Sequence, residues 1–185
     1  TCALPIYIIH LHTLHGGYFN LHSLDELSKQ YPILITMHDE WLLAGHCAYT
    51  IECENWKTGC GKCPDLKRYP GIHFDRTKTN YKIKHSILSK SCFSIVTPSE
   101  WLMDQVNLSP LSPFTKRVIP YGIDQSIFKP AHRLESKEKL GFHPQETIIL
   151  FLANRGKDNP HKDFKTIRKS IEFLSKRNIH NITFI

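Results

Sequence analysis

The sequence predicts an α/β fold in which parallel strands alternate with helices. Short apolar runs rich in β-branched and aromatic residues recur along the chain, as in "LPIYIIHLH" and "PILITMHDEW". Segments with a helical spacing of apolar residues separate these runs, and polar or glycine-containing turns divide the two. Strands and helices in alternation build βαβ units, whose strands form a sheet buried on both faces. The expected architecture is therefore Rossmann-like and doubly wound.

The individual elements follow from these local patterns. Asn20 and Ser99 are suitable N-cap residues for two of the helices, and Pro98 ends a strand. The predicted strands cover residues 5–12, 32–39, 147–155 and 181–185, while residues 93–99 hold a strand that Pro98 ends and residues 116–124 hold a short strand followed by a turn. The predicted helices cover residues 21–30, 76–89, 100–108 and 163–177. The last of these has Phe164, Ile167, Ile171 and Leu174 on one face.

The polar segment 125–140, which contains Pro130, has the composition of a linker that leads into a short helix. We therefore expect two domains, 1–124 and 141–185, with a boundary near Asp124. Strand-like runs at both ends, and no initiator Met, lead us to expect a fragment that holds only part of each domain.

The composition suits a globular protein, with 41% hydrophobic and 22% charged residues. A formal charge of +7, with basic residues gathered between 57 and 90 and again beyond 125, favours anionic partners. The sequence contains no apolar run near the roughly 20 residues of a membrane helix, and no signal peptide is recognisable at its start. Because the strand and helix pattern already supplies a core, we expect the cysteines to be reduced, in the cytoplasm.

Polar residues follow the predicted strands, where open α/β sheets bind their ligands. A histidine and an aspartate can also be no more than a hydrogen-bonded pair at a sheet edge. Two adjacent glycines allow close approach of the backbone to a ligand, or simply form a turn. The candidate binding residues at these strand ends are His12, His15, Gly16, Gly17, His38, Asp39 and Ser99.

Four cysteines lie close together in the loop 46–64, "HCAYTIECENWKTGCGKCP". They are Cys47, Cys53, Cys60 and Cys63. The last two form a CxxC step, whose spacing suits two thiolates on one tetrahedral ion. Four sulfurs favour a structural Zn²⁺ site that staples the loop. Two disulfides or buried thiols are the alternatives.

In their order along the chain, several motifs resemble the bacterial family 4 glycosyltransferases of colanic acid and O-antigen type polysaccharide synthesis. These motifs are "HLHTLHGGYFN", "PILITMHDEW", the cysteine-rich loop, "VTPSEWL", "VIPYGIDQSIFKP" and "NPHKDFKTI". The resemblance implies a GT-B enzyme with two Rossmann-like domains, the first binding a lipid-linked saccharide acceptor and the second a nucleotide-sugar donor. It also implies transfer with retention of anomeric configuration, without a catalytic metal.

The resemblance further implies roles for individual residues. His38 would lie beside the transferred sugar, and Lys162, with Arg155, would bind the donor diphosphate. Gly122 and Asp124 match the hinge motif between the domains, where Tyr121 replaces the family's common Asn. The basic segment, including Lys78, Lys82, Lys84 and Lys90, could face an anionic membrane surface. A fragment without most of the donor domain should transfer no sugar by itself.

Two alternatives from other classes fit parts of the sequence. A zinc deaminase carries HxE followed by PCxxC, which "HDE" at 38–40 and "CGKC" at 60–63 match in part, with Gly59 in place of the proline. A zinc-dependent nucleic-acid module would explain the aromatic residues among the basic ones between 57 and 90, although the family resemblance leads us to expect no nucleic-acid partner. These aromatic residues are Trp56, Tyr69, Phe74 and Tyr81.

Overall fold

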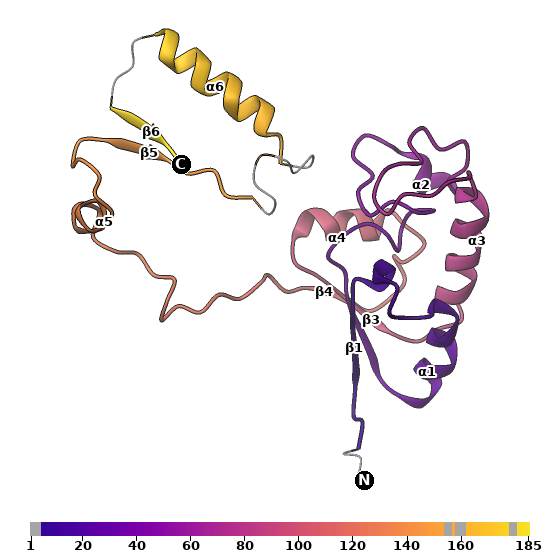
Figure 1. Cartoon of the computed structure of the whole chain (residues 1–185). Coiled ribbons are helices and arrows are strands. Elements are labelled where there is room, and N and C mark those ends of the chain that lie inside the picture. The colour runs from indigo at the N-terminus through magenta and orange to yellow at the C-terminus, as the bar shows by residue number, and fades with distance from the viewer. Residues whose placement is uncertain (1–4, 154–156, 158–161, 178–180) are drawn as a thin grey trace. The chain divides into compact units, whose positions relative to one another are not determined.

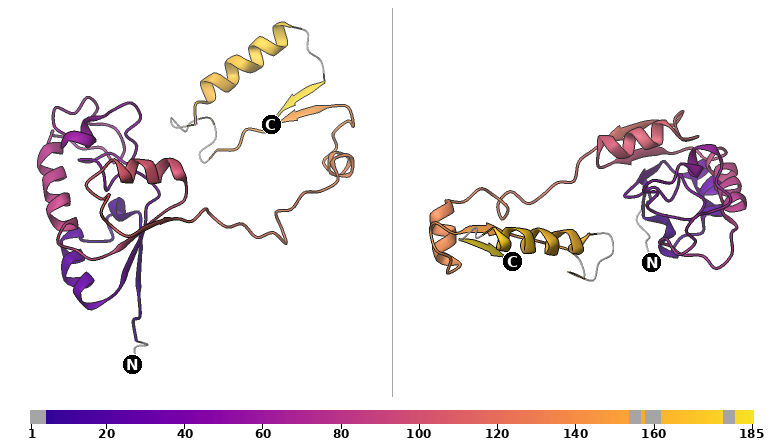
Figure 2. Two further views of the ribbon diagram at one scale, coloured as in Figure 1. Left: turned by 180° about the vertical axis from the view of Figure 1, so that it is seen from behind. Right: turned by 90° about the horizontal axis from the view of Figure 1, so that it is seen from above.

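A computed structural model describes the chain except for residues 1–4, 154–156, 158–161 and 178–180 (Figure 1). The chain divides into two compact units, Thr1–Gly122 and Ile123–Ile185, and the predicted domain boundary near Asp124 falls beside this division. Figure 2 shows the two units from two further directions. Each unit combines helices with a parallel sheet, which confirms the predicted α/β class.

The first unit is built on a four-stranded parallel sheet with the order β1-β2-β3-β4. Its register places Ile9 opposite Ile33, and Ile35 opposite Ile95. The strands are β1 (Ile9–His12), β2 (Ile33–Thr36), β3 (Ser94–Thr97) and β4 (Lys116–Val118). A doubly wound sheet reverses its strand order at one point. No reversal occurs among these four described strands.

The helices of the first unit connect successive strands. Helices α1 and α3 contact each other, and α4 contacts β3 and β4 (Figure 1). Besides the short 3-10 turns η1 (Leu14–Gly16) and η2 (Leu21–Ser23), the unit contains α1 (Leu24–Gln30), α2 (Asn55–Thr58), α3 (Thr77–Leu88) and α4 (Glu100–Asn107). The predicted N-cap at Ser99 is confirmed, because its hydroxyl accepts a hydrogen bond from the Leu102 N–H. Asn20 accepts one from the His22 N–H and caps the 3-10 turn η2, whereas Ser23 is the N-cap of α1.

The core of the first unit lies between the sheet and these helices. Ile35 and Ile95 are each 1% exposed, and Leu24 of α1 and Val106 of α4 are fully buried. The predicted strand was too long at its start, because residues 6–8 lie outside β1 and are largely exposed. The neighbouring strand β2 begins only at Ile33, just after Pro32, so the pairing with β1 begins at Ile9.

The second unit contains a two-stranded parallel sheet and two helices. Its elements are α5 (Arg133–Lys139), β5 (Thr147–Ile149), α6 (Phe164–Lys176) and β6 (Ile182–Phe184). The predicted strand 147–155 is shorter in the structure, with Leu150 and Leu152 exposed beyond β5. The predicted apolar face of α6 is present, and its four residues are half-buried.

Candidate functional site

The candidate site lies at the carboxyl ends of the strands of the first unit. His12 is the last residue of β1, while His38 and Tyr121 follow the ends of β2 and β4. Parallel strands end at a common edge of the sheet, which brings residues distant in sequence together there. His12 and His38 were singled out by this reasoning, whereas Tyr121 was noted only as part of a hinge.

A chain of hydrogen bonds joins these three side chains. Nδ1 of His12 lies 2.8 Å from Nε2 of His38, and Nδ1 of His38 is hydrogen-bonded to the Tyr121 hydroxyl. The rings are stacked, with centroids 5.1 Å apart for His12 and His38 and 5.6 Å apart for His38 and Tyr121. The His12 carbonyl also accepts a hydrogen bond from the Tyr18 hydroxyl. The imidazole of His38 is therefore held in one orientation from both sides.

Electrostatics favour a neutral His38. Burial and then the neighbouring His12 lower the pKa of His38, although Asp39 opposes this shift. Burial, followed by Asp39, raises the pKa of the Tyr121 hydroxyl. A neutral imidazole has one donor and one acceptor nitrogen. When Tyr121 donates to His38, His38 must donate to His12, and the reverse order holds when His38 donates to Tyr121.

His15 and Asp39 form a polar pair beside the hydrogen-bonded side chains of His12, His38 and Tyr121. His15 Nε2 lies 2.8 Å from an Asp39 carboxylate oxygen, and the other oxygen accepts a hydrogen bond from the Trp41 N–H. The two side chains are only 5% and 13% exposed. The sequence suggests His38 and Asp39 as a hydrogen-bonded pair, but in the structure the Asp39 carboxylate bonds His15 instead.

A groove of about 320 Å³ borders this pair. His15, Trp41 and Lys84 line it together with His46, Pro70 and Asn80. The aromatic ring, the imidazoles and the amide are suited to a polar ligand with an apolar face, as sugars are. The groove extends the polar strand ends toward the cysteine-rich loop, because His46 also lines a cavity among the cysteines.

The two glycines after β1 differ from each other. Gly17 has φ +78°, a conformation that favours glycine, and a side chain there would meet no atom within 4 Å. A Cβ on Gly16 would lie 3.4 Å from the ring of Tyr18. The turn alone thus accounts for Gly17, and ligand approach at Gly16 and Gly17 stays a prediction. A role of Ser99 in substrate binding is also still a prediction, since its hydroxyl caps α4.

The predicted hinge residues lie where the two units divide. Gly122 is the last residue of the first unit. Asp124 accepts hydrogen bonds from the N–H and the hydroxyl of Ser126, which order the turn that follows. Lys162 is exposed and immediately precedes Asp163, the N-cap of α6. Arg155, the second expected phosphate ligand, lies outside the described residues.

The four cysteines of the loop come together in space. Cys47, Cys53, Cys60 and Cys63 all line one small cavity of about 20 Å³, and all four are free thiols. As the side chains stand, no group of three His, Cys, Asp or Glu side chains among the described residues is arranged to hold a metal ion. The structure thus clusters the predicted ligands but does not itself form a tetrahedral site. Sequence reasoning missed His46, although it directly precedes Cys47.

Glu40 argues against the deaminase alternative, which needs a catalytic carboxylate after His38. The side chain is 3% exposed and accepts hydrogen bonds from the Thr50 N–H (2.8 Å) and the Thr50 hydroxyl (2.6 Å). These contacts fix the start of the cysteine-rich loop. Glu40 therefore has a structural role and is not available as a general acid or base.

Burial also changes the interpretation of the basic segment. Lys84 was expected on a charged surface but is buried, and its ammonium donates to the Trp41 carbonyl at 2.5 Å and lies 3.8 Å from the Trp41 ring centroid. The expectation fails because α3 packs this side chain against the segment after β2. Trp56 and Tyr81 are buried as well, which removes two of the four aromatic residues on which the nucleic-acid alternative depends. Lys78, Lys82 and Lys90 remain exposed.

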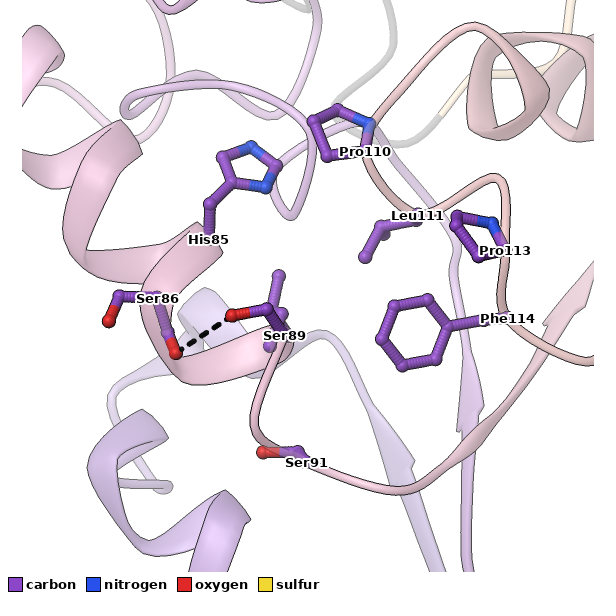
Figure 3. A pocket seen from close by; sticks show the side chains of 9 residues that line it. His85, Ser86, Ser89, Ser91, Pro110, Leu111, Pro113 and Phe114 are labelled. Carbon is purple, nitrogen blue, oxygen red and sulfur yellow. Dashed lines mark hydrogen bonds between the residues drawn. The ribbon is translucent and has the colours of Figure 1, made fainter.

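A larger pocket, of about 590 Å³, lies away from this site (Figure 3). It is lined by the end of α3 and by residues 110–114, and thus lies toward the amino ends of β3 and β4. His85, Leu111 and Phe114 surround it. Its mostly apolar lining and its position at the opposite end of the strands separate it from the polar groups described above.

Comparison with known proteins gives one significant relative. The chain is 34% identical over 130 residues to "Putative colanic acid biosynthesis glycosyl transferase WcaC" of Escherichia coli (strain K12). The match covers 64% of this chain and 32% of that protein, so the matched stretch spans about a third of the relative's length. No protein-family model matches the chain, and no solved structure shows significant similarity. The relative's name describes a glycosyl transferase of colanic acid biosynthesis, the type of protein that the sequence motifs resemble.

Proposed function

We propose that this chain is part of a glycosyltransferase that transfers a sugar from a nucleotide-sugar donor to a saccharide acceptor in cell-surface polysaccharide biosynthesis. The observation that carries the proposal is its similarity to the colanic acid enzyme. The polar groups at the carboxyl ends of β1, β2 and β4 support it, because ligands of parallel sheets bind there. In this proposal the fold is GT-B of family 4, with the acceptor on the first unit and the donor on the second.

The proposed chemistry is displacement of a nucleoside diphosphate. The bond between the anomeric carbon and the phosphate oxygen breaks, and a bond forms between that carbon and an acceptor hydroxyl oxygen. The hydroxyl proton passes to the departing phosphate, and anomeric configuration is retained. No catalytic metal is required, because Lys162 and Arg155 would neutralise the diphosphate. Stabilising the charge that develops on the leaving group is the principal catalytic contribution.

His38 has a positioning and hydrogen-bonding role in this proposal. Both nitrogens of this neutral imidazole are bonded, to His12 and to Tyr121, so a sugar hydroxyl would bond His38 by taking the place of one of these partners while the other keeps the ring in its orientation. The groove beside His15 and Trp41 would hold part of the acceptor. Gly122 and Asp124 would form the hinge between the two units.

The experiment compares turnover of the intact enzyme carrying this chain with that of His38→Ala and a matched control, His22→Ala. His22 is an exposed histidine of η2 and lies outside the site. Release of nucleoside diphosphate in the presence of acceptor saccharide gives the rate, and NMR of the product gives its anomeric configuration. We expect His38→Ala to lower kcat at least about 100-fold, and His22→Ala to leave it unchanged. Equal rates for all three proteins would show that His38 has no part in the reaction. A product with inverted anomeric configuration would refute the retaining mechanism.

We also propose that the acceptor is lipid-linked and that the enzyme works on the cytoplasmic face of the membrane. None of the described helices is both long and apolar enough to span a membrane. Exposed Lys78 and Lys82, one turn apart on α3, and Lys90 could contact anionic headgroups, each contributing about 1 kcal/mol. Sedimentation with anionic and neutral vesicles tests this contact. Binding that does not depend on anionic lipid would exclude it.

A further inference from the structure

The cavity in the cysteine-rich loop has the size and lining of a site for one ion. A void of roughly 10–15 Å³ is enough for one water-sized sphere, and this cavity has about 20 Å³. Its lining includes the four cysteines and also His46, which is 4% exposed. Five side chains of the types that bind zinc therefore surround a space with room for a single small occupant.

His46 is oriented as a metal ligand would be. Its Nδ1 lies 3.0 Å from the Pro70 carbonyl oxygen, which can only accept a hydrogen bond, so Nδ1 carries the hydrogen. The lone pair is therefore on Nε2, which lies 3.4 Å from the sulfur of Cys63. A histidine that binds metal commonly donates its other N–H to a backbone carbonyl in this way.

The turn that carries the CxxC step is held in an uncommon conformation. Cys60 and Lys62 have φ of 55° and 48°, on either side of Gly61 at 103°. Non-glycine residues adopt such conformations only when their surroundings enforce them. Here the Gly61 N–H donates to the Thr77 hydroxyl at 3.0 Å, and the Cys60 sulfur accepts a hydrogen bond from the Gly45 N–H at 3.2 Å. Burial raises the pKa of the Cys60 thiol, and the N–H of Gly45 aimed at its sulfur opposes this shift in favour of the thiolate, the form that binds metal.

The surroundings also supply positive charge for such a thiolate centre. Lys84 is 5% exposed, and among the described residues its ammonium forms no ion pair with a carboxylate. Burial lowers the pKa of Lys84 to about 7, and the thiols of Cys47 and Cys60, followed by Asp39, oppose this shift and favour the charged ammonium. Arg68 acts in the same sense on Cys47 and Cys63. A zinc ion with three thiolates and one neutral imidazole carries one negative charge, which buried Lys84 would balance, whereas half-buried Arg68 already pairs with Asp65.

We propose that this cavity is a structural Zn²⁺ site in which His46, Cys60 and Cys63 provide three ligands and Cys47 or Cys53 the fourth. Binding releases one proton from each of the three thiols, and the sulfurs rotate inward to the distance of about 2.3 Å that zinc requires. His46 Nε2 replaces its contact with Cys63 by a bond to the metal. The site would fix the loop beside the groove that His46 also lines. This inference does not depend on the glycosyltransferase proposal.

The test is metal titration of the purified 185-residue chain, reduced and stripped of metal. Zn²⁺ and Co²⁺ are the probes, because Co²⁺ bound to thiolates shows a charge-transfer absorption that Zn²⁺ then displaces. We expect one metal per chain and about three protons released for each Zn²⁺ bound. No binding to the reduced protein, or binding without thiolate absorption, would overturn the proposal. The proposal would also be overturned if the purified protein contained disulfides and did not bind zinc after these were reduced.

Two variants examine the histidine. His46→Ala should weaken Zn²⁺ binding at least about tenfold, whereas His73→Ala, which changes an exposed histidine beyond the loop, should not weaken it. His46→Cys should bind zinc and release about four protons, which keeps the test informative when the alanine variant fails to fold. Unchanged affinity in a folded His46→Ala protein would show that His46 is not a ligand. Comparing Cys47→Ser with Cys53→Ser identifies the fourth ligand, and exposed Cys92→Ser serves as the cysteine control.

Discussion

The two units contain the same kinds of element but differ in how much they bury. Among the described residues, every buried hydrophobic side chain belongs to the first unit, from Leu11 to Leu111. In the second unit the only buried residue of the described part is Lys137, whose ammonium donates to the Pro144 carbonyl at 2.7 Å. Four strands with helices packed on them enclose a core, whereas two strands do not. Local sequence pattern thus specifies helices and strands in both units, but their side chains become buried only where neighbouring strands and helices pack on them.

Matched truncations in the two sheets should give the largest contrast. Ile35 in β2 is 1% exposed, while Ile149 in β5 is 37% exposed. Ile35→Ala should lower the free energy of unfolding by about 2–5 kcal/mol, because it leaves a cavity in a close-packed core. Ile149→Ala should lower it by about 1 kcal/mol or less. Urea unfolding of the purified chain measures both.

Tryptophan fluorescence separates the two units in this experiment. The three tryptophans, Trp41, Trp56 and Trp101, all belong to the first unit, so their emission follows its unfolding alone. Far-UV circular dichroism follows both units. If Ile149→Ala moved the fluorescence transition as far as Ile35→Ala, the two units would not unfold independently and the contrast would be lost.

The pH dependence of stability should be stronger in the first unit because of His85. Burial, followed by the nearby charge of Lys84, lowers the pKa of His85 from 6.5 to about 4, and its ring lies 4.0 Å from that of Tyr81. Nε2 of His85 has no hydrogen-bond partner among the described residues (Figure 3). Between pH 6.5 and about 4 the unfolded chain binds a proton that the folded chain does not. The free energy of unfolding should therefore fall as pH decreases through this window.

His85→Gln removes this titration, so its fluorescence-detected stability should fall less between pH 6.5 and pH 4 than that of the unmodified chain. Carboxylates elsewhere also reduce stability in acid, and the difference between the two pH profiles isolates His85. His132→Gln in the second unit is the control, because this histidine is 65% exposed. Parallel profiles for His85→Gln and the unmodified chain would show that His85 does not resist protonation.

The sequence could predict what depends on near neighbours. The caps at Asn20 and Ser99 and the face of α6 are local features, and the structure contains them. The convergence of polar strand ends also followed from strand direction alone. The contacts that the sequence could not predict join residues that are distant in sequence. Lys84 reaches the carbonyl of Trp41, and the Tyr121 hydroxyl reaches His38 across 83 positions. Helical periodicity gave no indication of either contact.

The sequence also could not predict which strand residues are buried, or which side chains line the cavity in the cysteine-rich loop. Residues 6–8 have the composition of a buried strand but are exposed, because β2 offers them no pairing partner. The CxxC spacing indicates the sulfurs, but although His46 directly precedes Cys47, only the folded loop shows that its imidazole lines the same cavity and bonds the Pro70 carbonyl. Spacing identifies ligands that are close in sequence, whereas packing decides which other side chains reach the same space.

The helix caps offer the smallest and most local comparison between the units. Ser99 accepts a hydrogen bond from the Leu102 N–H at 3.3 Å, and Asp163 accepts one from the Thr166 N–H at 3.3 Å. Ser99→Ala and Asp163→Ala each remove one such acceptor, at a cost of about 1 kcal/mol in helix stability. Because α4 packs on β3 and β4, the loss at Ser99 should shift the tryptophan transition of the whole first unit. Helix α6 has no fully buried residue, so the loss at Asp163 should appear only as reduced helicity by circular dichroism. A fluorescence shift for Asp163→Ala equal to that for Ser99→Ala would mean that α6 also stabilises the first unit, contrary to the division of the chain into two units.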